Sequence, residues 1–155
     1  MRLLAIDPGY ERSAIVGYDC DTSLPVDKLV LPNEKVLFEL EHLHSLYEHL
    51  AIEMIASYGM PVGREIFETV LWIGRYVQVF RGPHTLVYRR EVKLHLCGSA
   101  RAKDANVRQA ILDRFGGMKA KGTKRQPGPL HGFRADLFAA LGVAVTWADL
   151  HLEVA

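Results

Sequence analysis

The stretch RLLAIDPGYERSAIVGYD, residues 2–19, contains two apolar runs on either side of a Pro-Gly turn. The runs at 2–6 and 13–18 have the length of β-strands, and Pro8-Gly9 between them is typical of a turn. They predict an antiparallel pair of strands. The first run ends in Asp7, and a carboxylate in apolar surroundings is costly unless it is paired or bound to a metal. Asp7 is therefore the first candidate functional residue.

The rest of the chain alternates between predicted strands and helices. Apolar spacing predicts further strands at 27–31, 50–55 and 85–88, and helices over 36–47, 63–80, 89–96, 104–115 and 134–149. Asn33 and Asp104 are predicted as helix N-caps, because their side chains can accept hydrogen bonds from free helix N–H groups. Residues 118–133, rich in Gly, Pro and Lys, are predicted as a loop. This order of elements indicates an α/β fold.

Length and composition limit the classes of protein to which the chain can belong. A chain of 155 residues predicts a single domain over 1–155. The two cysteines, Cys20 and Cys97, have neither metal-ligand spacing nor a disulfide framework, which favours a reducing interior. The chain shows no leader and no apolar run that could span a bilayer, so we expect a cytoplasmic protein without a membrane partner.

The basic residues are concentrated in one part of the chain. Residues 101–134 contain nine lysines and arginines against only Asp104 and Asp113. Such a surplus is typical of a surface that binds a polyanion. It can also be a solvated loop, since charged runs often serve solubility.

Two further carboxylates, Glu53 and Asp136, occur in apolar segments like that of Asp7. Adjacent strands lie about 4.8 Å apart, so Asp7 and Glu53 can converge if their strands are neighbours, and a packed helix can add Asp136. Three converging carboxylates repel one another and need cations, for which Mg²⁺ or Mn²⁺ is suited. The three acids therefore predict a catalytic two-metal site for phosphodiester cleavage, with ions about 3.5–4 Å apart.

Four segments together resemble the RuvC family of Holliday junction resolvases. LAIDPGYERSAIVGYD is similar to the first motif of that family and LAIEMI to the second, whereas VKLHLCGSARAKDANVRQAI is similar to its DNA-facing segment and ADLFAALGVAVT to its last motif. The resemblance covers essentially the whole chain. It implies an RNase H-like fold, with a five-stranded mixed sheet flanked by helices, and a homodimeric, Mg²⁺-dependent endonuclease that cuts opposed strands of four-way DNA junctions.

The resemblance also suggests roles for other residues. It implies DNA contacts by basic residues of the DNA-facing segment and of the following loop, which is similar to that of short phage-type members: Lys93, Lys103, Lys119, Lys121, Lys124 and Arg125. Many members carry a fourth metal ligand where this chain has Phe133, and His131 is a candidate replacement. Many members also have an aromatic residue where this chain has Ala56, and Tyr58 is a candidate to stack on DNA instead.

A dimer needs an apolar surface, and the helix over 63–80 has more apolar positions than one buried face requires, among them Phe67, Trp72 and Phe80. We expect this helix to form the dimer interface.

Two other functions remain open from the sequence alone. One is a YqgF-type RNA-processing nuclease, and the other is a non-catalytic DNA-binding module. The host predicted from the resemblance is a bacterium or a phage-infected cell.

Overall fold

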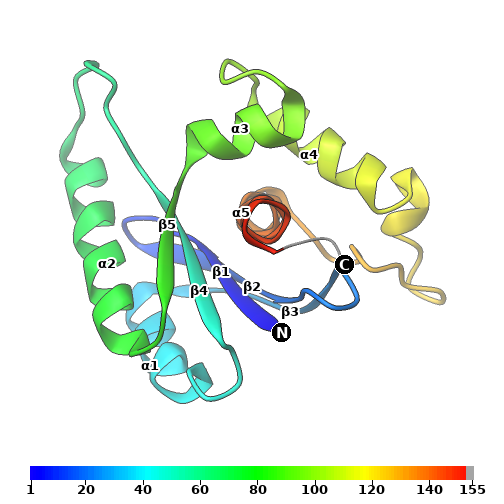
Figure 1. The fold of residues 1–155 in the computed structure, drawn as a ribbon, viewed down its shortest axis with the longest axis horizontal. Helices are drawn as coiled ribbons and strands as arrows, with labels where there is room; N and C mark the ends of the chain where they lie inside the picture. Colours follow the sequence, from blue (N-terminus) through cyan, green and yellow to red (C-terminus); the bar gives the residue numbers. More distant parts are fainter. Residues whose placement is uncertain (153–155) are drawn as a thin grey trace.

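The computed structural model describes residues 1–152, which contain a five-stranded mixed sheet (Figure 1). Its strands are β1 (Arg2–Asp7), β2 (Arg12–Asp19), β3 (Leu24–Pro32), β4 (His49–Met54) and β5 (His84–Tyr88). The order across the sheet is β3-β2-β1-β4-β5. Strand β1 is antiparallel to β2 and parallel to β4, and β4 is parallel to β5. The predicted α/β class and mixed five-stranded sheet are confirmed.

Helices cover both faces of the sheet (Figure 1). On one face lie α1 (Asn33–Leu43) and α2 (Arg64–Phe80); on the other lie α3 (Arg89–Cys97), α4 (Asp104–Arg114) and α5 (Ala135–His151), with the short 3-10 helix η1 (Gly117–Ala120) after α4. In β1, Leu4 and Ile6 pack in the core with α1 and α2, whereas Leu3 and Ala5 pack in the core with α5. A strand that is buried on both faces has a continuous apolar run, which explains the opening sequence.

Helix α5 is the most deeply buried helix of the described part of the chain. All of its residues from Leu137 to Ala148 are buried except Ala139, which is half-buried, because it crosses the sheet beneath α3 and α4. Its composition is correspondingly Ala-rich and apolar. No helix within residues 1–152 is long and apolar enough to cross a membrane.

Three predictions about individual residues are wrong. The N-cap of α1 is Pro32, and Asn33 is its first residue, with a buried side chain that bonds to the β1–β2 turn instead of to the helix. The N-cap of α4 is Lys103, and Asp104 is the first residue of the helix. The Lys103 N–H donates a hydrogen bond to Oδ1 of Asn106, the third residue of the helix. Phe80 is 1% exposed, since it faces the sheet, and so it cannot contribute to a dimer interface.

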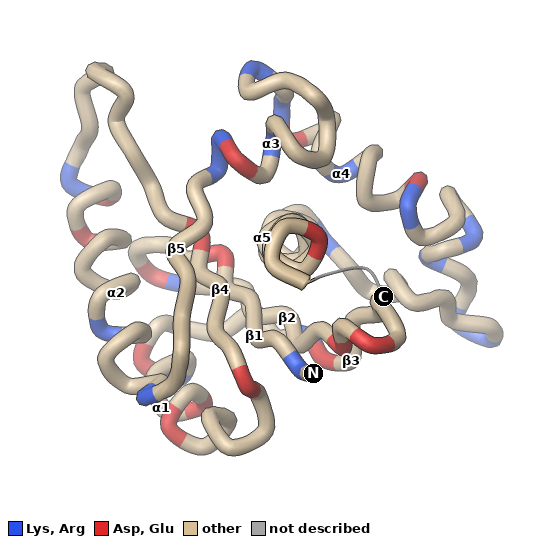
Figure 2. The backbone as a smooth tube through the Cα atoms, viewed as in Figure 1, with Lys and Arg blue, Asp and Glu red and all other residues tan. Residues whose placement is uncertain are grey.

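Charge is unevenly distributed over the molecule. Figure 2 shows lysines and arginines along α3, α4 and the segment that follows α4, whereas acidic residues are concentrated around α1. The basic side of the molecule therefore belongs to the layer that also contains α5.

Candidate active site

Asp7 and Glu53 lie side by side at the carboxyl ends of two parallel strands. The parallel register pairs Ala5 with Ala51 and Ile6 with Ile52, so Asp7 and Glu53 are the next residues along β1 and β4. Side chains alternate along a strand, and both carboxylates consequently point to the face that packs on α5. In open α/β sheets this is the edge at which ligands bind.

A buried hydrogen-bond network holds the turn that follows Asp7. Asn33 donates from Nδ2 to the Gly9 carbonyl at 2.8 Å, and its Oδ1 accepts from the Ser13 hydroxyl, also at 2.8 Å. The Ser13 oxygen also accepts from the Gly9 N–H at 3.3 Å and lies 3.0 Å from the Tyr76 hydroxyl of α2. A Cβ on Gly9 would come within 2.3 Å of the Arg12 carbonyl oxygen, so the turn needs glycine. The network fixes the backbone beside Asp7.

The third predicted acid, Asp136, lines the same cleft as Asp7 and Glu53. It is an exposed residue in the first turn of α5. The cleft has a volume of about 220 Å³ and lies between the sheet edge and helices α3, α4 and α5. Four carboxylates and three basic side chains line it: Asp7, Glu53, Asp104, Asp136, Arg89, Lys93 and Arg108. The structure thus brings the three predicted acids to one cleft.

The electrostatics of the cleft favour a bound cation. Burial, and next the charge of Glu53, raise the pKa of Asp7 to about 8. Burial likewise raises the pKa of Glu53, against the opposing effect of Arg89. Within residues 1–152, no ion pair and no side-chain hydrogen bond involves the Asp7 carboxylate. Hard carboxylate oxygens that lack a cation are suitable ligands for Mg²⁺ or Mn²⁺.

The acids are not already arranged as a metal cage. In the part of the chain that the structure describes, no three His, Cys, Asp or Glu side chains form a group that could hold an ion. Glu53 instead accepts a hydrogen bond from Arg89 Nε at 3.0 Å. Carboxylates without a cation between them repel, and the Arg89 guanidinium supplies the missing positive charge to Glu53. The carboxylate oxygens of the cleft are suitable metal ligands, but without a metal they are not grouped around one ion position.

The other predicted site residues lie at different distances from the cleft. Lys93 lines it, with Nζ 3.8 Å from Asp104, and Lys103 is exposed at the start of α4. The loop residues lie in or after η1 and are exposed, except for the half-buried Lys121: Lys119, Lys121, Lys124 and Arg125. His131 is not among the residues that line the cleft, and its Nδ1 lies 3.2 Å from the Lys121 carbonyl.

Tyr58 lies in the segment between β4 and α2. Its side chain is 60% exposed, with the Arg90 guanidinium 5.6 Å from the centre of its ring. The backbone at Tyr58 has a positive φ of 48°, which is uncommon for a residue other than glycine. The ring is thus available to a ligand, although it does not line the cleft.

Sequence analysis missed three charged residues of the cleft, namely Arg89, Asp104 and Arg108. Arg89 directly follows β5, as Asp7 ends β1, and the carboxyl ends of parallel strands meet at one edge. That position could have revealed it. Asp104 and Arg108 are four residues apart on α4 and therefore share a helix face, but the sequence does not show that this face is turned toward the sheet edge.

Comparison with known proteins identifies the fold. No family model and no curated protein sequence matches the chain. Among solved structures, Thermus thermophilus RuvC superposes with a TM-score of 0.72 at 15% identity, over 97% of this chain and 96% of that one. Thermus thermophilus RuvC in complex with a Holliday junction substrate gives 0.71 at 14% identity, over 97% of both chains. The chain has the RuvC fold, which confirms the predicted RNase H-like architecture.

Proposed function

We propose that this chain, which has the RuvC fold, is a structure-specific DNA endonuclease that cuts opposed strands of a four-way junction by two-metal hydrolysis. The observation that carries the proposal is the position of Asp7 and Glu53 at the ends of adjacent parallel strands, with Asp136 on the same cleft. The junction complex of Thermus thermophilus RuvC, which this chain matches over 97% of its length, supports the substrate class. The whole chain, 1–155, would form one nuclease domain.

Asp7, Glu53 and Asp136 are the residues that would hold two Mg²⁺ ions, or Mn²⁺ in their place. Asp7 is the best candidate for a ligand shared by both ions, because it lies on the central strand with no other partner among residues 1–152. When bound, the two ions supply an activated water and stabilise the leaving oxygen. His131 remains a candidate ligand only if the loop that carries it moves, since its ring now contacts Lys121.

The basic layer of the molecule would bind the phosphate backbones of the junction. Lys93 lines the cleft itself, and Lys103 directly precedes Asp104, which also lines it. Beyond them, Figure 2 shows the basic side chains continuing along α4 and the segment after it, which contains Lys119, Lys121, Lys124 and Arg125. Phosphate contacts position a substrate without reading its sequence, and they weaken steeply with salt. Tyr58 would add a stacking surface for a base at the opened junction.

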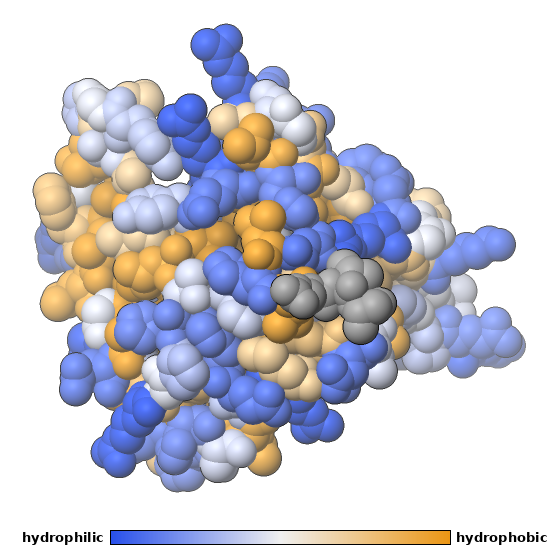
Figure 3. Space-filling view, in the orientation of Figure 1, coloured by the Kyte–Doolittle hydropathy of each residue, from blue (hydrophilic) through white to orange (hydrophobic). Residues whose placement is uncertain are grey.

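A homodimer would provide the second cut, and α2 offers the surface for it. Phe67 and Leu71 are both 65% exposed, four residues apart, and thus lie on one face of the helix. Gly74 continues this face, and a Cβ added to it would meet no heavy atom within 4 Å, so a second backbone could approach closely there. Figure 3 shows apolar side chains gathered on the left of the molecule, over α2 and β5. The proposed activity places the dimer with DNA in the cytoplasm of a bacterium or a phage-infected cell.

The proposal is tested with a labelled immobile four-way DNA junction, compared with linear duplex and structured RNA, in Mg²⁺ or EDTA. We expect symmetric paired nicks on the junction alone, which disappear in EDTA and in Glu53→Gln. Cleavage of RNA in place of the junction would support a YqgF-type nuclease. Tight junction binding without cleavage in Mg²⁺ or Mn²⁺ would support a non-catalytic module.

A further inference from the structure

Arg89 is one of three charged cleft residues, with Asp104 and Arg108, to which the proposed chemistry gives no role. Its Nε donates to Glu53 Oε1 at 3.0 Å, and the Glu53 side chain is 8% exposed against 50% for Arg89. The pair therefore joins a buried carboxylate to a guanidinium that is half in solvent. A group in that position can leave its partner without itself becoming buried and unpaired.

The location of Arg89 is not explained by its helix. Arg89 is the first residue of α3, and a positive charge at a helix N-terminus is unfavourable, because that end of the helix dipole is itself positive. The N-terminus of α3 already has an acidic partner, since Glu91 accepts a hydrogen bond from the Tyr88 N–H at 2.8 Å. The contact that accounts for the position of Arg89 is the one with Glu53.

The carboxylates of the cleft differ in whether they have a cationic partner. Asp104 has its own cation, Lys93, at 3.8 Å. No ion pair within residues 1–152 involves Asp7 or Asp136. Arg89 is therefore the cation in contact with Glu53, the neighbour of Asp7 on the adjacent strand. A divalent ion with Glu53 as ligand would bind the same carboxylate that the guanidinium contacts, and two positive charges so close together repel each other.

We propose that Arg89 is the resident counter-cation of Glu53, beside Asp7, and that it competes with a divalent ion for the Glu53 carboxylate. The inference rests on the proposed function. In the metal-free protein the guanidinium stabilises the buried Glu53 carboxylate, and on metal binding it moves into the open part of the cleft. Arg89 thereby stabilises the folded, empty site and weakens the affinity of that site for metal.

The test is calorimetric titration of the full chain, without DNA, with Mg²⁺ at pH 9, comparing wild type with Arg89→Gln. The matched control is Arg64→Gln, because Arg64 also donates from Nε to a glutamate, Glu68, but on the exposed surface of α2. We expect Arg89→Gln to bind Mg²⁺ about tenfold more tightly than wild type, which corresponds to about 1.4 kcal/mol, and the control to bind like wild type.

Thermal unfolding of the same proteins gives a second readout. In EDTA, Arg89→Gln should melt below wild type, because the buried Glu53 carboxylate loses its cation, and saturating Mg²⁺ should abolish most of this difference. Equal Mg²⁺ affinity in Arg89→Gln and wild type, with a loss of stability that Mg²⁺ does not reduce, would overturn the inference and leave the proposed function intact. Absence of Mg²⁺ binding by both proteins would overturn the inference and the two-metal proposal together.

Discussion

At the scale of single residues, the account depends on a carboxylate that lies in the wrong environment for its charge. Asp7 ends a buried strand, next to Glu53, without a side-chain partner among residues 1–152. Its pKa of about 8, raised first by burial, means that without a metal the carboxyl is protonated at neutral pH. Such a residue reduces stability when it ionises, and strongly raised pKa values of this kind cluster at functional sites.

Metal-free protein should therefore lose stability as the pH rises. The folded pKa of Asp7 lies above its unfolded value of 3.8, so the contribution of the neutral carboxyl is complete below pH 4 and is lost as the pH rises through about 8. In EDTA, Asp7→Asn should raise the free energy of unfolding at pH 9 by about 1.4 kcal/mol or more and have little effect at pH 4. Urea unfolding at the two pH values measures this. A variant that is less stable than wild type at pH 9 would contradict the raised pKa.

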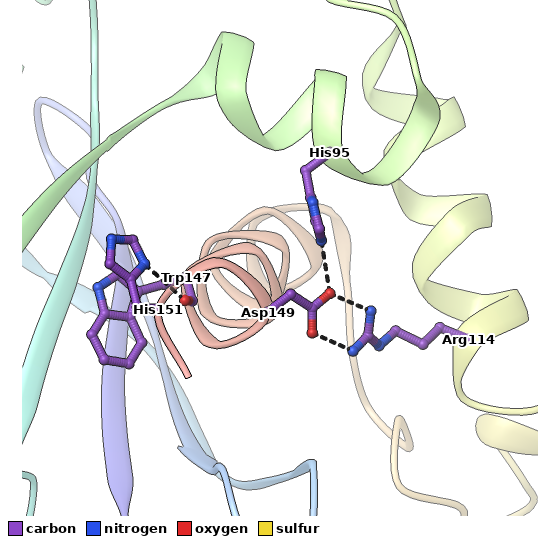
Figure 4. Close-up of polar contacts among 5 residues, drawn as sticks. All are labelled: His95, Arg114, Trp147, Asp149 and His151. Carbon is purple, nitrogen blue, oxygen red and sulfur yellow. Dashed lines mark hydrogen bonds and ion pairs between the residues drawn. The ribbon is translucent and has the colours of Figure 1, made fainter. Parts of the chain in front are cut away.

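At the scale of elements, both ends of α5 are fixed, which places Asp136. At its C-terminal end, Asp149 accepts hydrogen bonds from the two terminal nitrogens of Arg114 at 2.6 and 2.7 Å and lies 2.7 Å from His95 Nε2 (Figure 4). These contacts join α3 and α4 to α5. At the other end, Leu137 and Phe138 of the first turn of α5 pack into the core, whereas Asp136 beside them is exposed. The contacts at both ends of α5 therefore hold Asp136 at the cleft.

The β1–β2 turn is fixed in a comparable way by Asn33, and this contact can be tested. Asn33→Ala removes buried hydrogen bonds to Gly9 and Ser13, which should reduce the free energy of unfolding by about 1–3 kcal/mol. Because the turn also positions Asp7, junction cleavage should fall by about tenfold or more while junction affinity is unchanged.

The control for this change is Asn106→Ala, which removes an exposed side chain that caps α4. It should reduce stability without reducing cleavage of the remaining folded protein. If the Asn33→Ala variant cleaves the junction at the wild-type rate, the hydrogen bonds of Asn33 stabilise the fold but do not position Asp7.

The sequence predicted the elements better than the contacts between them. Strand and helix positions followed from apolar spacing, because the period of a strand or a helix is a local property. The role of Asn33 could not be predicted in this way, since its partners Gly9 and Ser13 lie more than 19 residues away and meet it only after the sheet forms. The contact of Arg89 with Glu53, 36 residues before it, is equally non-local, although the position of Arg89 directly after β5 is a local signal that could have indicated the cleft.

In the molecule as a whole, the two faces of the sheet carry different kinds of residues. The face with α3, α4 and α5 contains the three carboxylates of the cleft and the basic surface, whereas the face with α1 and α2 exposes apolar side chains (Figures 2 and 3). A dimer through α2 would leave both clefts open to DNA. The two opposed cuts of a junction would then come from one assembly.

Leu71→Arg should prevent this association by placing a charge on the exposed face of α2. We expect a shift from dimer to monomer in sedimentation analysis, and single nicks in place of paired ones. Leu46→Arg is the matched control, since Leu46 is 56% exposed but lies outside α2. Wild type that sediments as a monomer at micromolar concentration would contradict the dimer.

If Asp7, Glu53 and Asp136 form one catalytic site, replacing Asp136 should abolish cleavage, and because Asp136 is exposed its replacement does not disturb the core. The measurement is cleavage of an immobile four-way junction in Mg²⁺ by wild type, Asp136→Asn and Asp113→Asn, the last being an exposed aspartate of α4 outside the cleft. The account predicts paired nicks with wild type and Asp113→Asn, and intact junction with Asp136→Asn. Paired nicks from Asp136→Asn at the wild-type rate would contradict it.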